Sequence, residues 1–178
     1  TNKVGIELNT SIQTIAGTTG FGIDVVKVAI SSNNLGSRNR LMTTVFAEHR
    51  FLFFNDKLDV TPGIALNYFS DFDGNIFPGI DLGYQITDNI RTYANVGQTY
   101  RIPTYTDLYY SDPSTIGNEN LKQEEAFSQE IGFKYNRNNI DFSIAFFNRD
   151  AKNLIDYTKE NQTDKFFANN IRKLNTKG

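Results

Sequence analysis

The sequence contains no cysteine and only one histidine among 178 residues. Without cysteine the chain can form neither a disulfide scaffold nor a thiolate metal site. His49 alone cannot supply a multi-histidine metal site or a catalytic triad. The sequence also lacks a run of eighteen apolar residues, so no transmembrane helix is expected. We therefore predict no metal-binding residue and no helical membrane anchor.

Charge and catalytic motifs are equally sparse. The net charge is -2, and lysine and arginine are scattered, whereas a nucleic-acid-binding protein needs a basic patch. Glu124 and Glu125 are neighbours on an expected strand, where they point to opposite faces and cannot form a glycosidase pair. The glycines of 17–22 lack both a phosphate-loop lysine and dinucleotide-binding spacing, and indicate a flexible loop. We predict no catalytic residue, no cofactor, no nucleic-acid partner and no enzyme activity.

What the sequence does contain is a two-residue hydrophobic period. From Leu58 to Phe69 the even positions are mostly apolar and the odd positions mostly polar or small, and 76–86 repeats the pattern. This period is typical of half-buried strands, whose side chains alternate between two faces. We predict an all-β chain of about eight consecutive antiparallel, up-and-down strands, at Lys3–Ala16, Asn39–Phe54, 58–69, 76–86, 90–101, 126–135, 140–150 and from Phe166 onward.

The connections between these strands alternate in kind. Short polar turns are expected at 55–57, 87–89 and 136–139, and longer connections at 17–38, 70–75, 102–125 and 158–165. Tight turns at one end and long loops at the other are the layout of an outer-membrane β-barrel. In that barrel Leu66 and Ile80 would face lipid, and Asp59 and Asp81 would face the lumen.

Aromatic residues and prolines refine this prediction. The 15 Phe and 9 Tyr gather near the expected strand ends, as in the aromatic girdles of membrane barrels, although aromatics also favour strands in general. Pro62 and Pro78 interrupt two expected strands. Since proline cannot donate to a strand ladder, we predict a β-bulge at each.

The segment from 100 to 124 carries the most specific pattern. It reads Tyr-Arg-Ile-Pro-Thr at 100–104, Asp-Leu-Tyr-Tyr at 107–110 and Gly-Asn-Glu-Asn-Leu-Lys-Gln-Glu at 117–124. This order resembles the signature of TonB-dependent outer-membrane receptors. Leu154-Ile155-Asp156-Tyr157 and Asn170 further resemble the cobalamin-receptor branch, although siderophore and haem receptors share these motifs.

The resemblance implies a 22-stranded barrel whose lumen holds an N-terminal plug that contacts TonB. Residues 1–178 would be one internal part of that barrel domain, without the plug and the remaining strands, and incapable of transport alone. The absence of a signal peptide before Lys3, and a C-terminus in mid-strand, fit such a piece. Its expected partners are outer-membrane lipid, TonB through the absent plug, and a small molecule such as cobalamin, an iron chelate or haem, in the outer membrane of a Gram-negative bacterium.

Two roles are open for the motif residues. Arg101, Pro103, Gly117, Asn120, Leu121 and Glu124 belong to the family motif, and the candidate ligand-binding residues of the extracellular loop are Tyr105, Asp107, Tyr109, Tyr110 and Asn118. Pro103 would stop the strand, and Gly117 would help to turn the loop back toward the wall. Loop architecture is favoured over direct ligand contact for the motif as a whole.

Two other function classes fit an all-β chain. One is a non-transporting barrel that serves as a surface adhesin or as a receptor for phage or bacteriocins. The other is a soluble lipocalin-like barrel with a small ligand inside, which requires an apolar interior. The polar face of the expected strands is inverted for a lipocalin and suits a membrane barrel.

Overall fold

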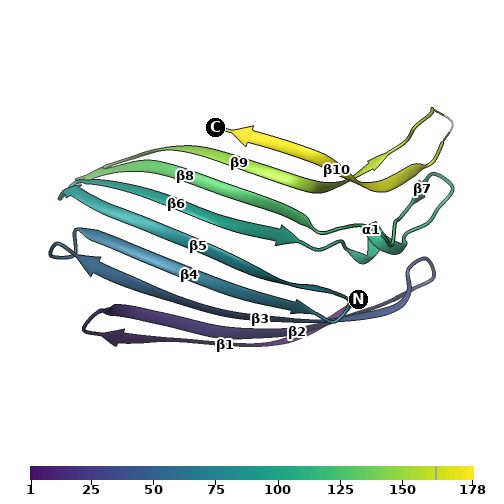
Figure 1. The fold of residues 1–178 in the computed structure, drawn as a ribbon, viewed down its shortest axis with the longest axis horizontal. Coiled ribbons are helices and arrows are strands. Elements are labelled where there is room, and N and C mark those ends of the chain that lie inside the picture. Colours follow the sequence, from purple (N-terminus) through teal and green to yellow (C-terminus); the bar gives the residue numbers. More distant parts are fainter. Residues whose placement is uncertain (163) are drawn as a thin grey trace.

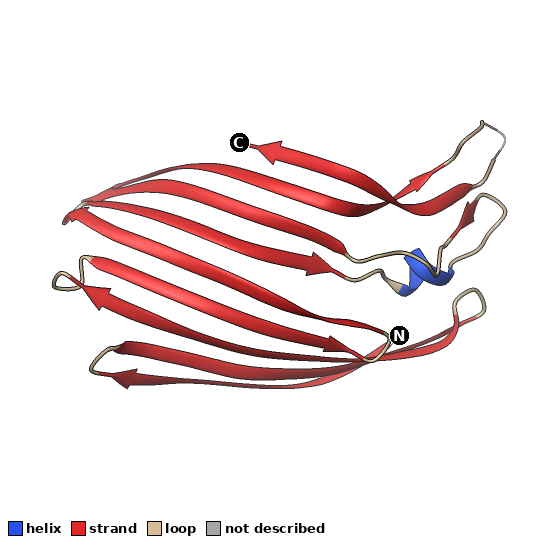
Figure 2. Ribbon diagram, viewed as in Figure 1, coloured by secondary structure: helices blue, strands red, loops and turns tan. Residues whose placement is uncertain are grey.

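The computed structural model describes residues 1–162 and 164–178 of the chain. They form one open sheet of ten strands in the order β1-β2-β3-β4-β5-β6-β8-β9-β10-β7 (Figures 1 and 2). Neighbouring long strands all pair antiparallel, and only the short β7 pairs in parallel. The elements are β1 Asn2–Thr14, β2 Gly17–Ser32, β3 Gly36–Phe53, β4 Leu58–Phe69, β5 Phe72–Thr87, β6 Ile90–Arg101, α1 Tyr105–Tyr109, β7 Thr115–Ile116, β8 Glu124–Arg137, β9 Ile140–Thr158 and β10 Phe166–Lys177. The up-and-down, all-β prediction is confirmed.

One strand was missing from the prediction. The segment 17–38 is not a long loop, because residues 17–32 form β2, which tight connections at 15–16 and 33–35 join to β1 and β3 at opposite ends of the sheet. The sheet therefore has nine long strands where about eight were expected, and β1 runs in the opposite direction to the one that a long 17–38 loop would require. No helix among the described residues is long and apolar enough to cross a membrane.

The glycines of 17–22, which led the sequence analysis to predict a loop in place of β2, have a packing role. A Cβ built on Gly22 would lie 2.6 Å from the Phe46 ring on β3 and 2.9 Å from the Leu8 carbonyl oxygen on β1. Glycine at this position lets the Phe46 side chain lie across the neighbouring backbone. The glycine-rich composition that indicated a loop thus reflects close packing across the inward face of the sheet.

We expect Gly22→Ala to lower the free energy of unfolding by about 1–3 kcal/mol, because the added methyl group overpacks the site. Gly63→Ala is the matched control on the same face, since its Cβ would meet only Glu48 Cβ at 3.4 Å and Ala47 O at 3.8 Å. Denaturant unfolding of the full-length protein in detergent measures both. Equal costs for the two variants would contradict this explanation.

The sheet carries its apolar residues outward and its polar residues inward. On β4 the side chains of Ile64, Leu66 and Tyr68 are 47%, 48% and 58% exposed, while Asp59 on the opposite face is buried. Asp59 is held there by Arg91 and, at 3.6 Å, by Arg50. Such an inverted sheet is typical of a membrane barrel wall, and it lacks the apolar interior that a lipocalin-like barrel requires.

The connections sort to two ends, as predicted for most of them. The turns near 55–57, 87–89 and 136–139 lie at one end of the strands, and the segments 102–123 and 159–165 lie at the other (Figure 1). Residue 163, in the segment 159–165, lies outside the described residues. The expected 70–75 connection is shorter than predicted, since β5 begins at Phe72.

The predicted bulges at the prolines are wrong. The register of β4 and β5 is continuous through Pro62 and Pro78, and shifts only between Asn67 and Phe69. The prolines are accommodated instead by missing ladder pairs. Pro62 has no partner among the β3 pairs, and the β5–β6 ladder begins only after Pro78, at Gly79 and Gly97.

Beyond Gly79 and Gly97, β5 and β6 diverge toward the loop end of the sheet (Figure 1). We call this divergence the seam. Side chains cross it where the backbone ladder does not. The rings of Phe77 and Tyr100 meet edge to face at 5.1 Å, and the amides of Asn75 and Gln123 exchange two hydrogen bonds of 2.6 and 2.7 Å.

Candidate functional site

The connection between β6 and β8 is a long folded loop, residues 102–123, that contains α1 and β7. Thr104 caps α1, because its hydroxyl accepts from the Asp107 N–H at 3.1 Å while the Asp107 carboxylate accepts from the Thr104 N–H at 2.9 Å. This reciprocal capping box fixes the start of the helix. The polar Thr-x-x-Asp spacing directly after Pro103 explains why the chain turns into a helix here.

Asp107 is also the centre of a polar network. Its carboxylate lies 3.4 Å from Arg101 Nη1 and accepts a 3.3 Å hydrogen bond from the Tyr157 hydroxyl. Arg101 Nη2 in turn lies 2.6 Å from Glu124, which also accepts from the backbone N–H of Ile155 at 2.8 Å. Arg101, Asp107 and Glu124 therefore tie the loop to the ends of β6, β8 and β9. Tyr157 faces inward to this network, so it is not part of an outward aromatic girdle.

The return half of the loop is held by asparagine side chains. Gly117 N–H donates to the Tyr110 carbonyl at 2.6 Å, and Asn118 donates from its side chain to the Ala168 carbonyl at 3.1 Å. The Asn118 side-chain oxygen accepts from the Asn120 N–H at 2.9 Å, which forms a local turn. A Cβ on Gly117 would lie 2.8 Å from the Leu108 backbone, so only glycine fits there.

A small apolar core lies beneath the loop. Leu108, Leu121 and Ala168 are 3%, 4% and 0% exposed, and Pro103 is fully buried. In a sheet that exposes its apolar side chains, this cluster is the main place where the described residues bury them together. The loop is consequently a packed structure with its own core, and both Pro103 and Leu121 are buried within it.

The loop also reaches back across the seam to β3. Arg40, 7% exposed, donates from Nη1 to the Pro103 carbonyl at 3.1 Å and pairs with Asp71 at 2.6 Å. The Arg38 guanidinium stacks 3.5 Å from the centre of the Tyr109 ring. Sequence reasoning missed both arginines, because their partners lie 63 and 71 positions away and no local pattern marks them.

The ligand-binding candidates separate into two groups. Tyr109, Tyr110 and Asn118 line one open cavity of about 390 Å³, together with Arg38, Gly117 and Asn120. Asp107 is buried in the network beneath, and Tyr105 packs under Arg40, whose guanidinium carbon lies 4.9 Å from its ring centre. The structure thus brings three of the five predicted residues to one surface, and places the other two in the support of the loop.

Three titrating groups of the loop have shifted pKa values. Burial raises the pKa of the Tyr105 phenol. The Tyr110 hydroxyl donates to the Asp112 carboxylate at 3.0 Å, and this bond raises the pKa of Tyr110. Hydrogen bonds from Ser114 lower the pKa of Asp112. The Tyr110 phenol at the cavity is therefore neutral at neutral pH.

An open, inverted, up-and-down sheet with tight turns at one end and a folded loop at the other is a segment of a membrane β-barrel wall. The family model for the TonB-dependent receptor-like β-barrel matches residues 2–178, and the chain belongs to that family.

Known proteins agree with this assignment. The ferrienterobactin receptor of Escherichia coli is 24% identical over 169 residues, which are 84% of this chain and 22% of that protein. The vitamin B12 transporter BtuB of Vibrio cholerae is 37% identical over 99 residues, which are 56% of this chain and 15% of that protein. The chain therefore spans at most about a fifth of these relatives.

Solved structures share the fold. The siderophore receptor PirA from Pseudomonas aeruginosa superposes with a TM-score of 0.86 at 19% identity, over 99% of this chain and 35% of that one. The Serratia marcescens hemophore receptor HasR, solved with its hemophore and heme, gives a TM-score of 0.82 at 14% identity, over 99% and 38%. The names of these relatives cover three ligand types, so they do not select one for this chain.

Proposed function

We propose that this chain is part of the barrel wall and extracellular loops of an outer-membrane receptor that takes up a scarce ligand with energy from TonB. The plug and the other strands would be supplied by the rest of the protein. The inverted sheet, with apolar side chains outward and the Asp59 network inward, is the observation that carries this proposal.

We further propose that the cavity of Tyr109, Tyr110 and Asn118 contributes to ligand binding. Tyrosine offers a large apolar area with a hydroxyl at low entropic cost, and Arg38 adds a fixed positive charge beside it. A ferric siderophore, vitamin B12 and haem all combine flat or apolar surface with polar groups, which suits such a surface. The relatives named above are receptors for ligands of these kinds.

Uptake by cells tests this function. A strain that lacks the gene and carries the full-length protein should accumulate one of radiolabelled ferric enterobactin, cyanocobalamin or haem, and should stop doing so when TonB is removed. Tyr109→Ala combined with Tyr110→Ala should reduce that uptake at least tenfold at equal surface expression. Asp88→Ala, in a short turn at the opposite end, is the control and should leave uptake unchanged.

The two parts of the proposal fail separately. Uptake that persists without TonB, or absent uptake of all three ligands by well-expressed protein, would contradict the transport role. TonB-dependent uptake that is unaffected by the double tyrosine variant would contradict only the role of the cavity.

A further inference from the structure

The tip of the β2–β3 hairpin, residues 33–35, contacts the 102–123 loop at the loop end of the sheet (Figure 1). The Asn34 side chain donates to the Ser111 carbonyl at 2.6 Å, and its amide oxygen accepts from the Ser111 N–H at 2.9 Å. One side chain thus pairs with both backbone groups of a single residue, as a neighbouring strand would. The contact joins segments that are 77 positions apart in the sequence.

The same tip also holds a second residue of the cavity of Tyr109, Tyr110 and Asn118. Ser111 and Arg38 both line that cavity. Arg38 donates from Nε to the Leu35 carbonyl at 3.1 Å, while its guanidinium stacks on the Tyr109 ring. The three residues of the tip therefore hold Ser111 through Asn34 and Arg38 through Leu35.

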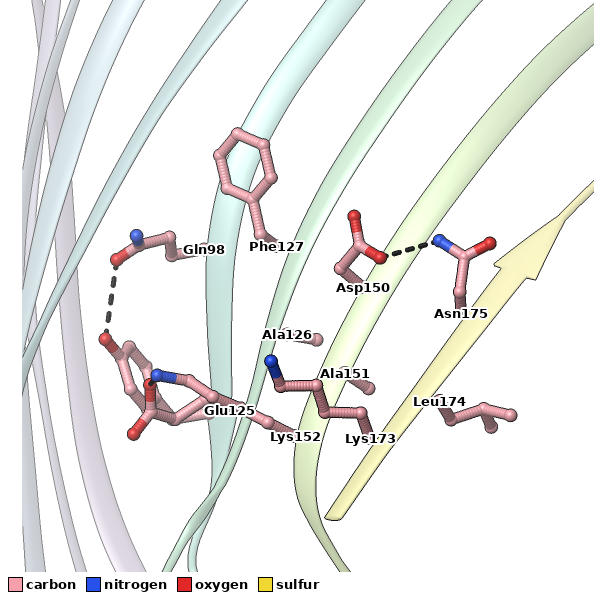
Figure 3. Close-up of a pocket in the computed structure, with 11 residues that line it drawn as sticks. Gln98, Glu125, Ala126, Phe127, Asp150, Ala151, Lys152, Lys173, Leu174 and Asn175 are labelled. Carbon is pink, nitrogen blue, oxygen red and sulfur yellow. Dashed lines mark hydrogen bonds and ion pairs between the residues drawn. The ribbon is translucent and has the colours of Figure 1, made fainter.

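No strand ladder sets the width of this cavity. The larger cavity on the outward face, about 440 Å³, lies over β6, β8, β9 and β10, which are joined to one another by backbone ladders (Figure 3). Its lining side chains are therefore fixed to strands whose spacing is already set. Among the described residues, the 33–35 tip and the 102–123 loop share no ladder pair, so side chains determine how far apart they lie.

The opposite flank of the same part of the loop is anchored independently. The Phe166 N–H donates to the Ser114 carbonyl at 2.8 Å, and Lys165 Nζ donates to the Asp112 carbonyl at 3.2 Å. The short β7 also pairs with β10. Loss of the Asn34 contact should therefore leave the loop folded and release only the side that faces the hairpin tip.

We propose that Asn34 is a positioning residue for the ligand cavity. It would hold Ser111 at the distance from Arg38 that suits the ligand, and it does not itself line the cavity. Both hydrogen bonds are exposed, so their loss should alter affinity without unfolding the protein. This inference rests on the proposed function, because it assigns to Asn34 the task of shaping the proposed binding surface.

Asn34→Ala in the full-length protein tests this role. The probe is whichever of radiolabelled ferric enterobactin, cyanocobalamin and haem the unchanged protein takes up. We expect the half-saturating concentration for uptake to rise about fivefold, since one net hydrogen bond is worth about that factor. The maximal rate should stay unchanged. Amide exchange at Ser111 should speed up by a similar factor, whereas exchange at Phe166 should not change.

Two further variants separate positioning from general damage. Asn33→Ala is the matched control, since Asn33 is the neighbouring exposed asparagine and takes no part in the contact with Ser111. It should behave as the unchanged protein does. Asn34→Asp keeps an oxygen for the Ser111 N–H but loses the donor to the Ser111 carbonyl, so its half-saturating concentration should be intermediate.

Two results would overturn the assignment of Asn34. One is the same half-saturating concentration for the Asn34→Ala and Asn33→Ala variants. The other is faster exchange at Ser111 with unchanged half-saturation, which would show a contact that has no part in binding. In either case, TonB-dependent uptake by the unchanged protein would leave the proposed transport function standing. Absent uptake of all three ligands by well-expressed unchanged protein would contradict both.

Discussion

Replacing Ile80 with arginine is expected to destabilise the protein folded in a bilayer by about 2–4 kcal/mol, the cost of a charge at the lipid-facing midplane of a barrel. Ile80 is outward and 38% exposed, and it lies opposite Pro62, near the middle of the apolar stretch of β4. Leu66→Arg should cost less than Ile80→Arg, since Leu66 lies close to the Tyr68 end of the band.

Asp81→Arg is the control for this prediction. Asp81 is the next residue on the same strand, exposed on the inward face, and arginine there should cost much less. Equilibrium unfolding of the full-length protein from lipid vesicles measures all three variants. If arginine cost the same at Ile80 and Asp81, the assignment of the two faces would be wrong.

Arg40→Ala is expected to release the 102–123 loop. The Arg40 side chain is 8% exposed and holds both Asp71 and the Pro103 carbonyl, so its removal leaves two polar groups without their partner. Breaking a buried pair costs about 3–5 kcal/mol, and we expect about 2–3 here because Asp71 is 27% exposed and partly screened. Amide hydrogen exchange in the loop should then speed up about 30- to 150-fold.

Arg50→Ala provides the comparison. Arg50 lies on the same strand and the same face, but its side chain is 52% exposed and 3.6 Å from its acidic partner Asp59. Its loss should change loop exchange less than twofold. Hydrogen exchange with mass spectrometry of the full-length protein separates the two cases, and equal protection of the loop in both variants would rule out Arg40 as its anchor.

The sequence was informative wherever the two faces of a strand differ strongly. Leu58–Phe69 could be assigned from alternation alone, because lipid on one side and polar lumen on the other act on every residue. β2 could not, since Gly20 and Gly22 hide its inward face and remove the contrast on which the period depends. Pro62 and Pro78 were recognised as unusual, but the sequence could not show that ladder pairs would be lost without a change of register.

The candidate site was likewise predictable only in part from the sequence. Motif residues such as Pro103 and Gly117 could be predicted to shape the loop, because their backbone properties are intrinsic to each residue. The groups that hold them, Arg40, Asp71 and Tyr157, come from three other parts of the chain. Only the register of the strands brings these groups together, and that register was not available from a single sequence.

The seam gives the wall a preferred line of mechanical failure. Along every other pair of long strands, peeling requires breaking a ladder of backbone hydrogen bonds. Beyond Gly79 and Gly97, by contrast, the contacts described between β5 and the elements across the seam are the Phe77–Tyr100 rings, which reach β6, and the Asn75–Gln123 amides, which reach the 102–123 loop. Mechanical stress at the loop end of the wall would concentrate at Gly79 and Gly97, where the β5–β6 ladder ends. The folded loop is attached to β6 and β8 on one side of the seam and to β3 on the other. It therefore limits how far the seam can widen.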